Sequence, residues 1–145
     1  MNFFNNLINW LEENNNLAYS FIRIFLGTAL LIRGWIMISD PGTIASLAGE
    51  DKTYWWFSYI TISHLAGGIF LAIGFLTRFA ALIQIPVLFG AVFLIHLKQG
   101  LLSVGQSLEL SLLVLVLLLI HFVFGSGSLS VDNSLKKKKL TSTLV

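Results

Sequence analysis

Cysteine is absent from the 145-residue chain. The sequence therefore has no disulfide framework, no thiolate metal site and no CxxC redox pair, so any electron-transfer role depends on a bound cofactor or a partner. Charged residues are also scarce, at 11% of the chain against 56% hydrophobic residues. Such a composition does not suit a soluble globular domain of this length, and we expect an integral membrane protein.

Positive charge is concentrated near the C-terminus. The formal net charge of +2 depends on four consecutive lysines, Lys136 to Lys139, without which the balance would be negative. The charge therefore gives no reason to expect a nucleic-acid partner. We interpret the lysines as a topology signal and a contact for anionic membrane lipid, with specific protein docking as the alternative.

Apolar runs long enough to cross a bilayer, roughly 20 residues as a helix, dominate the rest of the sequence. We predict a single domain over residues 1–145 with an all-α fold, a membrane-spanning antiparallel four-helix bundle. An amphipathic interfacial helix precedes the spans and a basic cytoplasmic tail follows them. The predicted segments are 1–16 (interfacial), 17–39, 54–76, 80–97 and 101–124 (spans) and 125–145 (tail).

Turn residues and basic residues set the connections and the orientation. Asp40-Pro41-Gly42 ends the first span, Thr77-Arg78 is predicted to link the second and third, and Lys98-Gln99-Gly100 separates the third and fourth. An even number of spans places both termini on one side, which holds Arg78 and the lysine run. Cytoplasmic loops carry the excess of lysine and arginine, so both termini are predicted to be cytoplasmic.

Two ionisable side chains lie within apolar runs, at a depth where charge is costly. Arg33 lies in the run 21–38 and Glu109 in the run 101–124. Both fall in the outer half of their spans, level enough to pair. Either they form an ion pair that locks the first span to the fourth, or they line a polar pocket that binds a head group or handles a proton. Arg23, near the cytoplasmic end, is expected to snorkel to the interface.

The three histidines fall at different depths. His64 lies midway along the second span and His96 near the outer end of the third, about 10 Å apart in depth, which is too far for two axial ligands of one haem iron. His121 belongs to the opposite end, near Arg23. Each is most simply a hydrogen-bonded polar group between helices. The candidates for ligand binding or proton handling are Arg33, Glu109, His64 and His96, and no catalytic or metal-ligating residue is assigned.

Small residues and one proline are expected to shape the packing. Glycine lets helix backbones approach closely in lipid, where hydrophobicity does not drive association. Pro86 is expected to bend the third span, and Gln84 beside it either satisfies a freed carbonyl or points into the bundle. The predicted packing glycines are Gly27, Gly34, Gly67 and Gly68.

A set of short motifs together resembles the DoxX family of small four-helix membrane proteins. The likeness runs from Arg23 to Asp132, and it rests on the order of the pieces, since no single one is specific. They are residues 21–27 (FIRIFLG), 33–34 (RG), 64–68 (HLAGG), 74–78 (GFLTR), Glu109 and 125–132 (GSGSLSVD).

The resemblance implies a multi-pass protein of the bacterial inner membrane. The DoxX family takes its name from a subunit of an oxidoreductase that passes electrons from thiosulfate to quinone. The resemblance therefore leads us to expect an accessory subunit of a quinone-linked redox assembly that is not catalytic alone. Quinone is then the expected non-covalent cofactor, and other membrane-protein subunits or an oligomer the expected partners. The alternatives are a small-molecule or lipid carrier, and a purely structural or assembly partner. The cysteine chemistry of the related vitamin K epoxide reductase fold is excluded.

Overall fold

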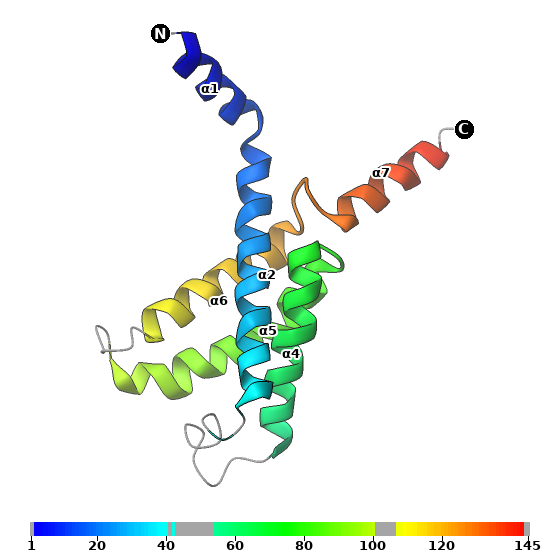
Figure 1. The fold of residues 1–145 in the computed structure, drawn as a ribbon. Coiled ribbons are helices and arrows are strands. Elements are labelled where there is room, and N and C mark those ends of the chain that lie inside the picture. Colours follow the sequence, from blue (N-terminus) through cyan, green and yellow to red (C-terminus); the bar gives the residue numbers. More distant parts are fainter. Residues whose placement is uncertain (1, 41, 43–53, 101–106, 144–145) are drawn as a thin grey trace.

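The computed structural model of the chain describes residues 2–40, 42, 54–100 and 107–143. Every regular element in these residues is a helix, as the sequence predicts, and Figure 1 shows their course. The elements are α1 (Asn2–Glu13), α2 (Asn15–Ser39), α4 (Tyr54–Ile73), α5 (Thr77–Gly90), a π-helical turn (Ala91–Ile95), a 3₁₀ turn (His96–Gln99), α6 (Ser107–Phe124) and α7 (Val131–Thr143).

Among the residues that the structure describes, three helical stretches are long and apolar enough to cross a membrane: Asn16–Ser39, Thr77–Lys98 and Ser107–Phe124. The apolar part of α4, Ser58–Ile73, is shorter, although the helix itself has 20 residues. The first residues of the predicted fourth span, 101–106, lie outside the described residues. The chain is therefore a membrane protein built from apolar helices.

Helix α2 packs closely on α4, and glycine permits the approach. A Cβ atom at Gly68 would lie 2.7 Å from the backbone nitrogen of Leu31, and one at Gly34 would lie 2.9 Å from that of Leu65. A Cβ at Gly27 would meet the backbone of Ala72 at an even shorter distance. Any larger residue at these positions would push α2 away from α4.

The remaining long helices form a second packed pair. Helix α5 lies against α6 and also against α4, and the buried leucines Leu71, Leu115 and Leu118 lie in the shared core. Figure 1 shows α5 and α6 running obliquely to α2 and α4, while α1 and α7 both extend from the end where α2 begins. The two terminal helices therefore lie at the same end of the molecule.

The turn between α4 and α5 differs from the predicted one. Thr77 and Arg78, expected to form the link, are the first two residues of α5, and the turn consists of Gly74, Phe75 and Leu76. Helix α4 ends in a Schellman motif, in which the N–H of Phe75 donates to Phe70 O and that of Gly74 to Leu71 O. Gly74 has the positive φ, +75°, that this motif requires.

Candidate functional site

The interior between α4 and α5 holds two fully buried polar side chains, His64 and Gln84, which are 2% and 0% exposed. Gln84 lies directly over Gly67, where a Cβ atom would come within 2.6 Å of Nε2. Gly67 is three residues after His64, so both α4 residues face the same side of their helix. We call His64, Gly67 and Gln84 the α4–α5 seam.

Several polar atoms of the seam lack a hydrogen bond of ordinary geometry. Among the described residues these are Nδ1 of His64 and both Nε2 and Oε1 of Gln84. The Gln84 side chain nevertheless lies close enough to interact with the His64 ring. Of the two alternatives predicted for Gln84, it therefore points into the interior and does not satisfy a carbonyl freed by Pro86. Burying such groups without partners is costly, so an unmatched group calls for a ligand or an ordered water. The seam can offer both donors and an acceptor.

Arg33 lies beside the seam. Its neighbour Gly34 packs on His64, whose Cβ is 3.1 Å from where a Cβ at Gly34 would lie. The charge of Arg33 also acts on the His64 ring. The Arg33 side chain is nevertheless exposed on the surface of α2.

Glu109 and His96, the other two candidates, are half-buried, Glu109 in the first turn of α6 and His96 at the start of the 3₁₀ turn. Among the residues that the structure describes, no ion pair joins Arg33 to Glu109, so the predicted pairing is not formed. Their roles in ligand binding or proton handling stay predictions.

Arg23 departs from the prediction. It is 0% exposed and does not snorkel to the interface. Its guanidinium donates to Leu71 O, Ala72 O and Leu129 O. The first two belong to the last turn of α4, where carbonyls lack partners within the helix and where a positive charge is favourable. The carbonyls at the end of α4 thus hold Arg23 inside, although Leu71 O also accepts from the Gly74 N–H.

Asp132 completes this arrangement from the far end of the sequence. Its carboxylate accepts hydrogen bonds from the N–H groups of Leu76 and Thr77, at 2.9 and 3.0 Å, and so caps α5. Leu76 has a φ of +47°, a strained value for a residue with a side chain. The Asp132 N–H donates to Gly74 O. We call Arg23, Gly74, Leu76 and Asp132 the turn cluster.

Tyr19 and His121 extend the bonding around the turn cluster. The Tyr19 hydroxyl donates to Gly125 O, and its ring stacks on His121 with centroids 4.7 Å apart. Nδ1 of His121 donates to Leu117 O. His121 therefore lies at the α2 N-terminal end, apart from the seam, as the sequence predicts.

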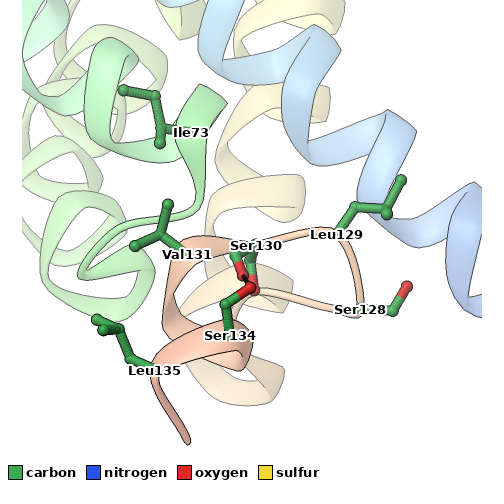
Figure 2. Close-up of a pocket in the computed structure, with 7 residues that line it drawn as sticks. All are labelled: Ile73, Ser128, Leu129, Ser130, Val131, Ser134 and Leu135. Atoms are coloured by element: carbon green, nitrogen blue, oxygen red, sulfur yellow. Dashed lines mark hydrogen bonds between the residues drawn. The ribbon is translucent and has the colours of Figure 1, made fainter. Parts of the chain in front are cut away.

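A shallow pocket of about 450 Å³ lies beside the turn cluster, between the end of α4 and the start of α7. Figure 2 shows Val131 and Leu135 on the α7 side with Ile73 across from them. The pocket hydroxyls are already bonded within the chain: Ser128 donates to Asn16 O, Ser130 to Gly127 O and Ser134 to Ser130 O. This pocket therefore offers a contact surface and few free polar groups.

Sequence reasoning missed the turn cluster. Asp132 is 55 residues from Thr77, and no local pattern connects a residue after α6 with the start of α5. The only available signal was the resemblance itself, because the motifs that carry it include Arg23, Gly74 and the exit segment 125–132.

Comparison with known proteins agrees with the resemblance. The DoxX family model matches residues 18–97, which include Arg23, Arg33, His64 and Gln84. Neither the curated proteins nor the solved structures gave a match. The matched stretch spans all of α2, α4 and α5 apart from the first residues of α2, and it is more than half of the 145-residue chain. The protein therefore belongs to the DoxX family.

Proposed function

We propose that this DoxX-family protein is an accessory subunit of a quinone-linked redox assembly in the bacterial inner membrane. In this proposal α2, α4, α5 and α6 form an antiparallel bundle, α1 lies along the interface, and both termini are cytoplasmic. The common position of α1 and α7 at one end of the molecule supports the placement of the termini. The lysines of α7 then face the cytoplasm, where positive charge is favoured.

The α4–α5 seam is the proposed place for the quinone head group. A quinone carries carbonyl oxygens that accept hydrogen bonds, and an imidazole N–H and an amide NH₂ are suitable donors. The unmatched Nδ1 of His64 and Nε2 of Gln84 are the observation that carries the proposal. A bound quinone would supply the electron-carrying chemistry. The residues of this chain would bind and orient it, and no residue is assigned a catalytic step.

The approach to the seam that this proposal requires lies along the contact of α4 with α5. Tyr59 on α4 is exposed, and its hydroxyl donates to the carbonyl of Ile83, the residue before Gln84 on α5. A lipid-soluble ligand would enter between the two helices near this bond, with only its polar head group meeting His64 and Gln84.

The test is quinone retention by the purified protein in mild detergent, measured as quinone extracted per chain after incubation with a short-chain ubiquinone. His64→Leu and Gln84→Met each remove one proposed donor, and each is expected to weaken binding about five- to tenfold. Ser63→Ala is the matched control, because Ser63 is buried on the same helix but donates locally to Ile60 O. Equal retention in all four proteins would contradict the proposal.

A further inference from the structure

Helix α2 has an exposed face that includes a charge. Ile22, Ala29, Arg33 and Ile36 share one side of the helix at spacings of seven, four and three residues, and all four are exposed. The opposite side carries Gly27 and Gly34, which pack on α4. We call the exposed face, Ile22 to Ile36, the Arg33 stripe. It lies within a stretch, Asn16–Ser39, that is long and apolar enough to cross the membrane.

Arg33 is poorly placed to reach water by snorkelling. It is six residues before Ser39, roughly 9 Å below the nearer end of α2. Side chains on a helix lean toward its N-terminus, so the Arg33 side chain leans away from this nearer end. An arginine at this depth is expected to face a partner or a cavity and not lipid.

Another arginine of the same helix shows how such a charge is hydrogen-bonded when all its partners lie within the chain. Arg23, ten residues earlier on the same helix, is fully buried and donates to three carbonyls. Arg33 has no comparable set of acceptors in the described residues, and its side chain is exposed. An exposed charge at this depth therefore calls for a partner.

We propose that the Arg33 stripe is the docking surface for a transmembrane helix of a partner protein that carries an aspartate or glutamate level with Arg33. The apolar residues of the stripe supply the packing, and the carboxylate of the partner neutralises the guanidinium. The inference deepens the proposed function, on which it rests, because an accessory subunit needs a membrane-embedded contact with its assembly.

A second copy of this chain fits the stripe poorly. Two parallel copies related by a two-fold axis would bring the same surface of each together. Arg33 of one copy would then lie near Arg33 of the other at the same depth, and like charges repel in a low-dielectric medium. Charge complementarity therefore favours a different protein with an acidic residue.

The experiment uses designed transmembrane peptides as the probe. Three leucine-rich 23-residue helices carry glutamate, glutamine or leucine six residues from the outer end. Each bears an acceptor dye, and the protein bears a donor at Ser39→Cys, the only thiol because the chain has no cysteine. Association is measured by energy transfer in quinone-free phosphatidylcholine vesicles. We expect the glutamate peptide to bind about three- to tenfold more tightly than the leucine peptide.

Variants identify the origin of the preference. Arg33→Leu is expected to abolish the preference for the glutamate peptide, and Arg33→Lys is expected to retain part of it. Lys98→Leu removes an exposed positive charge outside the stripe and is expected to leave the preference unchanged. Thermal unfolding followed by circular dichroism checks that each variant is folded. The Arg33→Lys variant keeps the test decisive if Arg33→Leu does not fold.

Three results would overturn the proposal. One is equal binding of the glutamate and leucine peptides. Another is Arg33-dependent energy transfer between labelled copies of the protein, which would identify a second copy as the occupant. A third is a combination of two observations: spin-labelled phosphatidylglycerol is enriched around the wild-type protein but not around Arg33→Leu, and the glutamate peptide binds no better than the leucine peptide. This combination would identify a lipid head group as the occupant. Quinone retention is measured without peptide, so either proposal can fail alone.

Discussion

The turn cluster lies where α4 passes into α5, and the α4–α5 seam lies between the same two helices farther along, yet the polar groups of the two regions differ in their hydrogen bonding. At the turn, Arg23 and Asp132 are hydrogen-bonded to backbone groups of four segments of the chain. Thr77 and Gln84 are two helical turns apart on the buried face of α5, and at the second position the polar atoms are unmatched. A matched cluster stabilises the fold, whereas an unmatched one reduces stability and is available to bind a ligand.

The matching at the turn is not complete, and the exceptions are informative. Nε of Arg23, Oγ1 of Thr77 and Nε2 of His121 also lack partners in the described residues. The side chains of Arg23 and His121 have other hydrogen bonds, and His121 also stacks on Tyr19. At Thr77 it is the backbone N–H that donates to Asp132. At Gln84 both polar atoms of a longer side chain are unmatched. The comparison therefore rests on Arg23 and Asp132 at the turn and on Gln84 in the seam.

Replacement of the two α2 arginines gives the largest expected contrast. Arg23→Met removes the guanidinium donor from the carbonyls of Leu71, Ala72 and Leu129, of which Leu71 O still accepts from the Gly74 N–H. We expect a loss of about 3 kcal/mol in the free energy of unfolding. Arg33→Met, the matched control on the same helix, removes an exposed charge and is expected to change it by less than about 1 kcal/mol. Unfolding by SDS in mixed micelles, followed by circular dichroism, measures both. Equal losses would contradict a special role for the turn cluster.

The cap on α5 is expected to contribute less than Arg23. Asp132→Ala removes the acceptor for the N–H groups of Leu76 and Thr77, and we expect a loss of about 1–2 kcal/mol in the free energy of unfolding. The same change frees the connection to α7, so limited proteolysis is expected to cut near residue 130 more rapidly. Glu12→Gln, on the exposed surface of α1, is the control. Unchanged proteolysis and stability in Asp132→Ala would show that the cap is dispensable.

Strain at Leu76 allows a change of the opposite sign. Leu76→Gly relieves a φ of +47°, and the entropy cost of glycine offsets part of the gain, so we expect an increase of about 0.5–1 kcal/mol in the free energy of unfolding. Phe75→Gly in the same turn is the control and is expected to destabilise, because Phe75 makes an edge-on ring contact with Phe70. A loss of stability in Leu76→Gly as large as that in Phe75→Gly would mean that the strain is negligible.

The sequence was sufficient to predict the long apolar helices, because each of them depends on a long apolar run. The predicted start of the third span was three residues late, since the position of the first turn of α5 is set by Asp132, which is distant in sequence. Helix α7 was predicted only as a tail. Its start is fixed by Ser130, whose hydroxyl accepts the N–H of Asn133, and its lysine run has no apolar periodicity.

The candidate site could be predicted in part, for a similar reason. Depth along a span follows from residue number, so the separation of His121 from His64 was predictable. The direction in which a helix crosses its neighbours does not follow from residue number. The oblique course of α5 and α6 relative to α2 in Figure 1 is a result of packing. Arg33 and Glu109 were therefore expected to pair on depth alone. The inward position of Arg23 depends on carbonyls at the end of another helix, which sequence spacing does not reveal.

The smallest expected effect on stability belongs to Gln84, and it tests the comparison from the other side. Gln84→Met replaces an amide whose polar atoms are unmatched by an apolar side chain of similar length. Removing unsatisfied groups in this way is close to neutral or stabilising, so we expect a change between zero and an increase of about 1 kcal/mol in the free energy of unfolding. The measurement is the same SDS titration, with Ser63→Ala as the control. If Gln84→Met destabilised the protein as much as Arg23→Met, the seam would be a structural cluster like the turn, and its unmatched atoms would have to be bonded to internal water. A stable Gln84→Met protein that retains less quinone would instead separate the two regions by function, because the side chain would then contribute to binding and not to folding.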